Sequence, residues 1–272
     1  MISQEKLTSR YLFQGQLVLL SALHVGGGKV RYNNTDSPVV RTAGGDPFVP
    51  GSSFKGVFRS SVEKILASLE GFEPCQIFDK NNNCPTVHQE EYNEKRKNLS
   101  EDDFLNKIEA NICSGCSLFG SPYTAGILYF QDLYIKSWSG IIPVRDGVAI
   151  DRDSERAVDK KKYDYEVVEA GAVFDMNLHL ENPGETDLAV TTVGLQELIN
   201  GFFYLGGKRS RGLGHCCLEN LKIYVLAVDK GDEDERMESL RRYLTGVTLE
   251  EKMTPIENVN QFLGDNIKKL VS

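Results

Sequence analysis

The chain has 272 residues, of which 40% are hydrophobic and 26% are charged, an ordinary composition for a soluble globular protein. No apolar run reaches the roughly 18 residues that a membrane-spanning helix needs, and residues 1–6 lack the charged-then-apolar pattern of a signal peptide. We therefore expect a cytoplasmic protein with no membrane partner. The net charge of −8 argues at first against a nucleic-acid ligand.

The charge is unevenly distributed along the chain. Residues 1–69 carry a balance of +4, whereas residues 70–110 carry −5 and residues 228–272 carry −3. The acidic residues are thus concentrated in a polar internal segment and in the C-terminal tail. A local basic groove on an acidic body is compatible with this pattern, although net charge alone does not favour it.

Patterns in the first half of the chain predict one strand and one helix. Residues 11–23 are apolar and partly alternating, as in a strand, and a loop over residues 26–50 follows. Apolar residues at helical spacing predict a helix over residues 52–69. Residues 70–111 are polar and poor in aliphatic side chains, which is typical of a surface insertion.

The second half predicts two more strands around a long excursion. Residues 126–134 have the pattern of a strand, and residues 172–180 alternate almost strictly between apolar and polar. The segment 141–170 between them is polar, with charges of both signs, and we expect a long loop or a protruding hairpin there. Loops of that length are usually functional or disordered.

A helix over residues 188–205 and a strand over residues 215–228 complete the predicted core. The order strand, helix, strand, strand, helix, strand is that of a ferredoxin-like fold, an antiparallel sheet with two helices on one face. We therefore predict an α+β protein with a single domain over residues 1–228. Residues 229–272 are expected to form a C-terminal tail with two short helices.

Two elements near the N-terminus are suited to bind phosphate. The glycines at 26–28 let backbone N–H groups approach an anion, because no Cβ stands in the way. At the start of the first predicted helix, Ser52 and Ser53 are candidate caps, and Lys55 and Arg59 are spaced i,i+4 on one face. Free N–H groups, the helix dipole and two cations together predict a phosphate site.

A third such element lies near the C-terminus, where residues 206–214 contain four glycines and three cations. The loop is either a cradle of backbone and guanidinium groups for phosphate, or a glycine-terminated helix followed by a solvated basic turn. Its pairing with the two N-terminal elements favours the cradle. Asp36 lies between those N-terminal elements, and from the residues alone we favour an Asx-type turn at Thr35–Pro38.

Six cysteines occur in a chain for which disulfides are not expected. Cys75 and Cys84 stand at one end of the polar insertion, and Cys113 and Cys116 at the other. These four thiolates can supply a structural zinc site with tetrahedral geometry, and His88 is the substitute ligand. A polar segment of this kind needs such a staple to stay ordered. The alternative is a set of unrelated free thiols.

Five motifs that occur in one order carry a resemblance to a known family. They are His24–Gly28, Thr35–Pro38, Val49–Arg59, Cys116–Pro122 and Gly206–Gly214. Together they resemble the RAMP superfamily, and most closely the backbone (filament) subunit of type III CRISPR–Cas effector complexes. The resemblance covers roughly residues 11–228, and the combination is specific although no single motif is.

The resemblance implies an RRM-like core that lies along a guide RNA. It further implies that residues of about 140–171 form a thumb-like β-hairpin, which enters the guide–target duplex and splays a base pair at regular intervals. The insertion of about 70–120 resembles the zinc-bearing insertions of the family. Expected partners are the CRISPR guide RNA, a single-stranded target RNA, and other effector subunits, including neighbouring copies or relatives.

The resemblance also assigns roles to individual residues. Asp36 matches the aspartate that cleaves target RNA with help from a divalent cation such as Mg²⁺, which implies an endoribonuclease that cuts by 2′-OH transesterification. His24 is expected to contact the guide rather than to act as a general base. The full set of expected guide contacts is His24, Gly26, Gly27, Lys29, Ser52, Ser53, Lys55, Arg59, Arg152, Arg156, Lys208, Arg209 and Arg211.

Other interpretations stay open on the sequence. The chain is alternatively a catalytically inert structural subunit that binds the guide, or a metal-independent endoribonuclease that processes guides; an unrelated small-molecule enzyme is the residual case. Trp138 and the tyrosines at 123, 129 and 134 are either base-stacking platforms or core residues, and we favour core packing for most of them.

Overall fold

An antiparallel β-sheet forms the centre of the computed structural model, which describes residues 6–27, 35–72, 74–75, 84, 94, 97–121, 124–229 and 231–271. The strands lie in the order β10-β9-β1-β7-β4-β2, with β3 beside β7 and β8 beside β9. The long strands are β1 (Ser9–Leu19), β4 (Leu133–Ser137), β7 (Val173–Glu181) and β9 (His215–Ala227). The short strands are β2 (Phe48–Val49), β3 (Leu128–Phe130), β8 (Phe203–Tyr204) and β10 (Thr254–Pro255).

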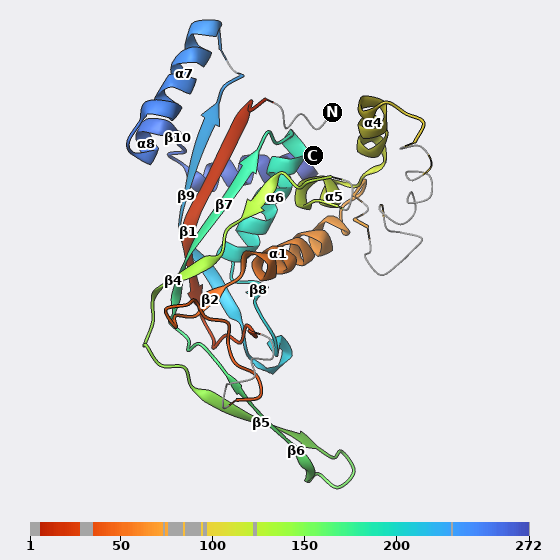
Figure 1. Cartoon of the computed structure of the whole chain (residues 1–272), viewed down its shortest axis with the longest axis vertical. Helices are drawn as coiled ribbons and strands as arrows, with labels where there is room; N and C mark the ends of the chain where they lie inside the picture. Colours follow the sequence, from red (N-terminus) through yellow and green to blue (C-terminus); the bar gives the residue numbers. More distant parts are fainter. Residues whose placement is uncertain are drawn as a thin grey trace.

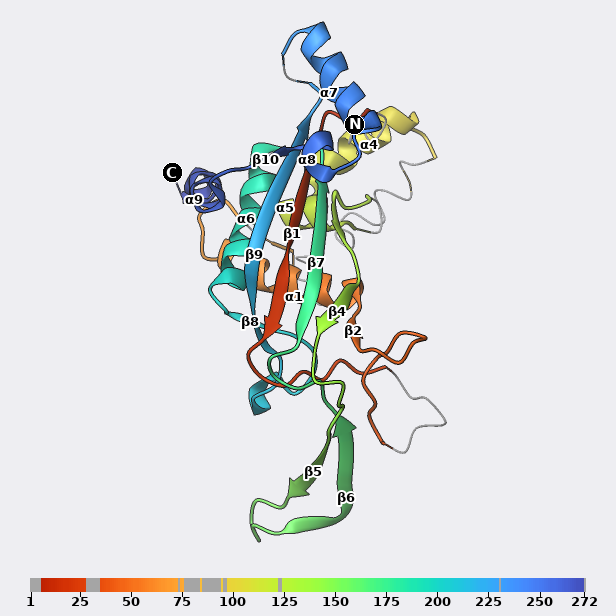
Figure 2. The same cartoon turned by 90° about the vertical axis from the view of Figure 1, so that its left-hand side faces the viewer.

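The predicted chain order of the core is confirmed. Strands β1, β7 and β9 correspond to the first, third and fourth predicted strands. Strand β1 pairs antiparallel with both β7 and β9, and β4 lies on the far side of β7. The two core helices, α1 (Gly51–Leu66) and α6 (Glu185–Ile199), lie on the same face of this sheet (Figures 1 and 2). Alternate residues of β1 point to that face, which buries Phe13, Leu17 and Leu19 against the helices.

Aromatic packing fixes α1 against its neighbours. The ring of Phe58 meets Phe54, Phe119 and Phe203 edge-on or tilted, and all four rings are buried. Gly194 of α6 makes room for this ring, because a Cβ at that position would lie 2.2 Å from Phe58 Cζ. The two helices therefore pack where one presents a large ring and the other no side chain.

Several predicted boundaries differ from the structure, and three of the differences have a clear physical cause. The predicted second strand is divided into β3 and β4, because strand pairing is interrupted at Gln131–Asp132. There the Asp132 carboxylate accepts the N–H of Gly51 (2.7 Å). The second core helix ends at Ile199 rather than at 205, since Gly201 turns the chain with φ of +73°. Pro50 is the N-cap of α1, so Ser52 and Ser53 lie inside its first turn.

The polar excursion forms a two-stranded antiparallel hairpin made of β5 (Val144–Ile150) and β6 (Ala157–Glu166). This hairpin projects away from the sheet at the end opposite to α7 (Figures 1 and 2). The polar insertion contains α4 (Glu101–Asn111) and α5 (Ser114–Phe119). No described helix is long and apolar enough to cross a membrane.

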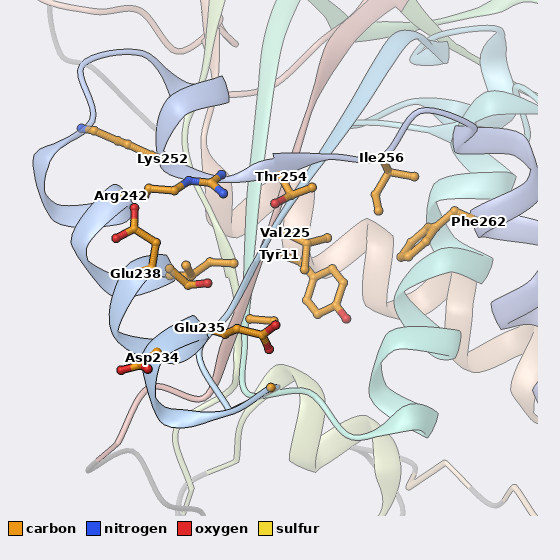
Figure 3. A pocket seen from close by; sticks show the side chains of 14 residues that line it. Tyr11, Val225, Asp234, Glu235, Glu238, Arg242, Lys252, Thr254, Ile256 and Phe262 are labelled. Carbon is orange, nitrogen blue, oxygen red and sulfur yellow. The ribbon is translucent and has the colours of Figure 1, made fainter.

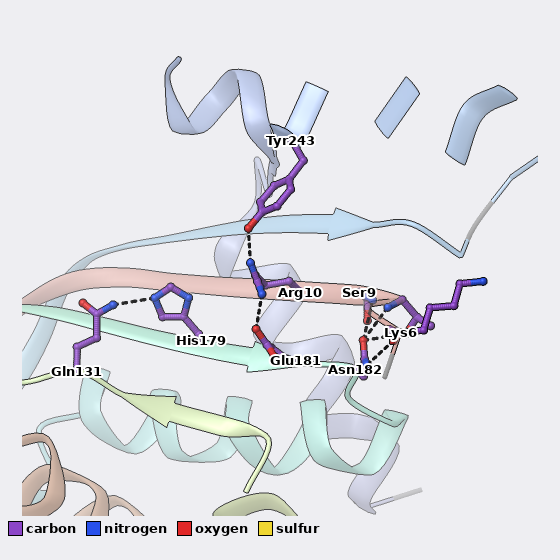
Figure 4. A network of polar contacts seen from close by, with 9 residues as sticks. Lys6, Ser9, Arg10, Gln131, His179, Glu181, Asn182 and Tyr243 are labelled. Carbon is purple, nitrogen blue, oxygen red and sulfur yellow. Dashed lines mark hydrogen bonds and ion pairs between the residues drawn. The ribbon is translucent and has the colours of Figure 1, made fainter. Parts of the chain in front are cut away.

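The C-terminal segment wraps around the sheet. Helices α7 (Glu233–Thr245) and α8 (Leu249–Lys252) lie over the face opposite to α1 and α6, where Leu12, Tyr224, Leu226 and Met253 form a second apolar cluster. Arg10 on β1 contacts both Tyr243 of α7 and Glu181 of β7 (Figure 4). Helix α9 (Val259–Val271) returns to the helical face and packs on α6, with Leu263 fully buried in the main core.

The aromatic residues divide between core and surface. Trp138 is partly buried against the core, as expected. Tyr129 and Tyr134 are 43% and 56% exposed, so core packing is wrong for these two. Tyr129 stands opposite His179 on the open side of the β3–β7 pair, and Tyr134 stacks on Phe48 with ring centroids 5.9 Å apart. Tyr123 lies outside the described residues.

Candidate functional site

Several predicted site residues meet where the hairpin leaves the sheet. We call this region the hairpin base and define it as His24, Asp36, residues 163–166 and residues 208–211. Two main-chain hydrogen bonds between Leu23 and Val168, each 2.8 Å long, hold the segment that contains His24 at the hairpin base. Since Val168 lies two residues after the end of β6, these bonds fix the loop after β1 against the root of the hairpin.

The glycine-rich basic loop is tied to the same point. The N–H of Gly207 donates to the carbonyl oxygen of His24 (2.9 Å). Gly206 has φ of +68°, and a Cβ there would lie 2.2 Å from that oxygen, so only glycine fits. Glycine in this loop therefore permits close contact with the chain itself, and the contact places the following cations beside the hairpin.

His24 is buried at this junction and only 7% exposed. Its Nδ1 lies 2.8 Å from the carbonyl oxygen of Glu166, and its ring meets Tyr165 edge-on with centroids 5.7 Å apart. Burial, helped by the nearby charge of Lys208, lowers the pKa of the imidazole, although the contact with Glu166 opposes this shift. The ring is therefore neutral near neutral pH and packs against β6. Its expected contact with guide RNA stays a prediction.

Two of the three loop cations lie against tyrosines of β6. The Nζ of Lys208 is 4.2 Å from the ring centroid of Tyr165 and 5.6 Å from that of Tyr163. Arg211 donates a hydrogen bond to the hydroxyl of Tyr163 (2.6 Å). Arg209 is exposed beside them in a short 3₁₀ turn. The loop thus brings positive charge to one side of the hairpin strand.

Asp36 lies at the same strand and is exposed. Its N–H donates to Asp164 Oδ1 (2.6 Å), and its Oδ2 accepts the N–H of Asp164 (3.1 Å). An Asx-type turn is not what holds it, since the residue two positions on is Pro38, which has no N–H to donate. Ser37 continues the contact as a parallel bridge to Tyr165.

The start of α1 is arranged differently from the predicted phosphate site. The N–H of Gly51 is already bound by the Asp132 carboxylate, which places a negative charge at this helix end. Ser52 and Ser53 are exposed, and Lys55 is half-buried. Burial, together with the charge of Arg59, lowers the pKa of Lys55. These residues are available to a ligand, but one donor of the predicted set is already used.

Arg59 is engaged by protein groups. It forms an ion pair with Glu63 (2.7 Å), donates to the carbonyl oxygen of Gly120 (3.3 Å), and reaches Cys116 Sγ (3.5 Å). Its guanidinium also lies over the ring of Phe119, 5.8 Å from the centroid. Although Lys55 and Arg59 share a helix face, Arg59 is directed to the cysteines. Its role in guide binding stays a prediction.

The remaining predicted contacts are spread out. Gly26 and Gly27 are exposed beside the Pro38–Val40 segment, to which Gly27 donates a main-chain hydrogen bond. Arg152 and Arg156 are exposed in the turn between β5 and β6, at the tip of the hairpin. Lys29 and His88 lie outside the described residues.

Four cysteines of the insertion gather into one cluster, as their spacing predicts. The Sγ atoms of Cys75, Cys84, Cys113 and Cys116 all lie within 4.8 Å of one another, and those of Cys75 and Cys116 are 3.2 Å apart. A hydrogen bond from Cys116, with help from backbone N–H groups, lowers the pKa of Cys113 to about 4, against the effect of burial. Four thiols at these separations, partly or fully buried, can hold a metal ion.

Comparison with known proteins identifies the family of this chain. The sequence model of the RAMP superfamily matches residues 16–217. The chain belongs to the RAMP superfamily. It is 26% identical over 225 residues to a protein of Streptococcus thermophilus named CRISPR system Cms endoribonuclease Csm3, covering 77% of this chain and 87% of that protein. A protein of the same name from Methanocaldococcus jannaschii is 26% identical over 257 residues, covering 86% and 89%.

The match of this RAMP-superfamily chain begins within β1 and spans β2 to β8, both core helices and the hairpin. It ends in β9, so the C-terminal helices lie beyond it. In that part a cavity of about 840 Å³ opens between α7, β10 and α9 (Figure 3). None of the predicted site residues lines it. Tyr11, Val225 and Phe262 form its apolar side, and Asp234 and Glu235 contribute carboxylates.

Sequence reasoning missed the residues of β6 that organise the hairpin base. Tyr163 and Tyr165 receive the cations, whereas Asp164 and Glu166 hold the Asp36 loop. A signal for them exists, because tyrosines and carboxylates alternate from 163 to 166, and alternate residues of a strand point to opposite faces. That pattern was hidden within a segment expected to be either a loop or a hairpin.

Proposed function

We propose that the chain is a guide-RNA-binding backbone subunit of a type III CRISPR effector complex and cleaves complementary target RNA at Asp36. The observation that carries this proposal is the position of Asp36, an exposed carboxylate bound to the root of a projecting hairpin. The cations of the glycine-rich loop flank the same strand. The name of the relatives, an endoribonuclease of a CRISPR system, supports the same reaction class.

The proposed reaction uses the ribose of the target. A nucleotide splayed by the hairpin frees the neighbouring 2′-OH to line up with the adjacent phosphate. Asp36 then orients that hydroxyl or accepts its proton, and the 2′ oxygen attacks phosphorus. The bond between phosphorus and the 5′ oxygen breaks, and water donates the proton that the leaving oxygen takes up. The products are a 2′,3′-cyclic phosphate and a 5′-OH. A divalent cation such as Mg²⁺, when bound, would neutralise charge on the phosphate.

Guide binding is proposed to use the cationic and glycine-rich elements. Lys208, Arg209 and Arg211 lie together on one loop, and Lys55 with Ser52 and Ser53 lies at the start of α1. Contacts of this kind bind the phosphate backbone without reading sequence, which suits a protein that accepts many guides. Target RNA and other effector subunits, including neighbouring copies, complete the proposed partners.

We further propose that the cysteine cluster holds structural zinc. Tetrahedral thiolate sites are typical of this ion, and separations under 4.8 Å between the sulfur atoms suit bonds of about 2.3 Å. The cluster joins Cys75 and Cys84 to Cys113 and Cys116 across the polar insertion. Zinc bound there would keep the insertion against α1.

The test compares Asp36→Ala with a matched control in the assembled complex. Asp46→Ala is the control, because Asp46 is exposed in the same loop between β1 and β2. We expect Asp36→Ala to slow cleavage at least about 100-fold, with guide and target affinity unchanged, while Asp46→Ala cuts at the normal rate. Target RNA with 2′-deoxy nucleotides at the cut positions should stay intact.

Two outcomes contradict the catalytic proposal. If Asp36→Ala cleaves at the normal rate, Asp36 is not catalytic, and the subunit is either inert or uses another residue. Cleavage of the 2′-deoxy target at the normal rate would exclude attack by the 2′-OH. A complex that purifies without a discrete short RNA would contradict guide binding itself.

A further inference from the structure

Strand β6 is held differently on its two sides at the hairpin base. On one side, Tyr163 and Tyr165 meet Lys208, Arg211 and His24. On the other, the carboxylates at 164 and 166 hold the loop that carries Asp36. Because successive side chains of a strand point to opposite faces, the tyrosines and the carboxylates lie on opposite faces of β6. The carboxylates therefore contact the loop that carries Asp36 and not Lys208 or Arg211.

The segment that follows Asp36 lies along β6 like an added parallel strand. Ser37 forms a parallel bridge to Tyr165 and accepts the N–H of Glu166 (3.0 Å). The Glu166 carboxylate then accepts the N–H of Val39 (3.0 Å) and pairs with Arg41 (2.8 Å). The loop is thus fixed by residues on both sides of the serine, and Asp164 supplies the contact at Asp36 itself.

The contact between Asp36 and Asp164 is reciprocal. The Asp164 carboxylate accepts the backbone N–H of Asp36 at 2.6 Å, a charge-assisted bond. The backbone N–H of Asp164 donates to Oδ2 of Asp36 at 3.1 Å. Both the main chain and one carboxylate oxygen of Asp36 are therefore fixed by one residue. Within the described residues no hydrogen bond engages Oδ1 of Asp36, which leaves that oxygen available to a ligand.

We propose that Asp164 is a positioning residue for Asp36 and couples it to the hairpin. This inference rests on the proposed catalytic function of Asp36. Asp164 does not touch the reacting atoms; it holds the Asp36 carboxylate at a fixed place relative to the strand that enters the duplex. The hairpin then delivers a distorted nucleotide and the carboxylate as one unit, so the site of distortion and the site of cleavage coincide.

Four variants of the full chain, each assembled into the complex with its guide, test the proposal. Asp164→Ala removes the acceptor for the N–H of Asp36, whereas Asp164→Asn keeps an oxygen there. Asp146→Ala is the matched control, because Asp146 lies directly opposite on β5 and pairs with Lys162 rather than with the loop. Asp36→Ala reports separately on the proposed function.

We expect Asp164→Ala to lower the single-turnover rate at saturating target by about 10- to 100-fold, since a misplacement of about 1 Å has effects of that size. Asp164→Asn should recover the rate to within about threefold, because an amide oxygen also accepts the hydrogen bond. Asp146→Ala should cut normally. Target affinity and melting temperature should be unchanged in all of these variants.

The possible failures are distinguishable. If Asp36→Ala is inactive and Asp164→Ala cuts normally, the positioning role is wrong and the catalytic role stands. If Asp164→Asn is as slow as Asp164→Ala, the charge of Asp164 matters rather than its acceptor, and the proposal falls. An equal loss in Asp146→Ala would show a general effect of the hairpin and would also overturn it. If Asp36→Ala cuts normally, the proposed function itself fails.

Discussion

The hairpin base and the cysteine cluster both join segments far apart in the sequence, but they do so with different chemistry. At the hairpin base, polar groups that are mostly exposed or half-exposed surround the buried His24 and Glu166, and main-chain hydrogen bonds and contacts between cations and rings hold them. In the cysteine cluster, four thiols gather against α1 beside the half-buried Arg59. The first arrangement leaves groups facing solvent, and the second turns them inward.

This difference predicts which region stabilises the chain and which region acts on a ligand. Inward-facing thiols that bind a metal contribute to folding, because the site does not exist in the unfolded chain. The groups at the hairpin base gain little from each contact, so their loss should affect a ligand more than the fold. The predictions below test that division from the largest expected effect to the smallest.

Removal of one cluster cysteine should have the largest effect on stability. In Cys113→Ser we expect bound metal to be lost and the free energy of unfolding to fall by about 4 kcal/mol, as when a structural metal is removed. Metal content by elemental analysis and urea unfolding measure both effects. Cys217→Ser is the control, because Cys217 lies outside the cluster on β9. Equal stability of the two variants would contradict a structural metal.

Gly206→Ala should disrupt the junction of the glycine-rich loop with His24. Its φ of +68° is strained for alanine, and the added Cβ would meet a carbonyl oxygen. We expect the free energy of unfolding, measured with urea, to fall by about 3 kcal/mol. Gly212→Ala is the matched control, since Gly212 has φ of +83° but nothing within 4 Å of an added Cβ, and it should lose about 1 kcal/mol. Equal losses in the two variants would contradict a specific contact at Gly206.

The two cations of α1 should separate into a structural and a ligand-binding residue. Arg59→Ala leaves Glu63 without its partner and is expected to lower the free energy of unfolding by about 2 kcal/mol. Lys55→Ala should leave stability unchanged but weaken guide binding and reduce the salt slope of the affinity by about 1. Unfolding curves and guide titrations at several salt concentrations check this. If Arg59→Ala weakened guide binding and Lys55→Ala lowered stability, the ligand contact would lie at Arg59 instead.

The smallest effect concerns pH. The pKa of His24 is lowered, so between its folded value and about 6.5 the unfolded chain binds more protons than the folded one. The contribution of the neutral ring to stability is therefore complete above about pH 6.5 and declines below it. Between pH 7.5 and 5.5, the free energy of unfolding of His24→Asn should fall by about 1 kcal/mol less than that of the unchanged protein. Parallel pH dependence in both proteins would contradict a buried neutral ring.

Much of the fold follows from patterns in the sequence. Alternation in β7 and β9 and helical spacing in α1 predict the element order, because one face of each element must be buried. The spacing of the four cysteines likewise predicts their cluster. Boundaries were predicted less well, since Asp132 ends a strand by binding Gly51, a residue 81 positions away. No local pattern contains that contact.

The sequence by itself determined which side chains suited to phosphate, metal and proton chemistry this protein has, and in which order they occur. The tertiary structure alone decided which of them meet. It directs Arg59 toward the cysteines, places Lys208 over Tyr165, and joins Asp36 to Asp164 across 128 positions. Composition and periodicity report on one element at a time, whereas a site depends on where separate elements come together. Packing of the sheet and the root of the hairpin settle that position.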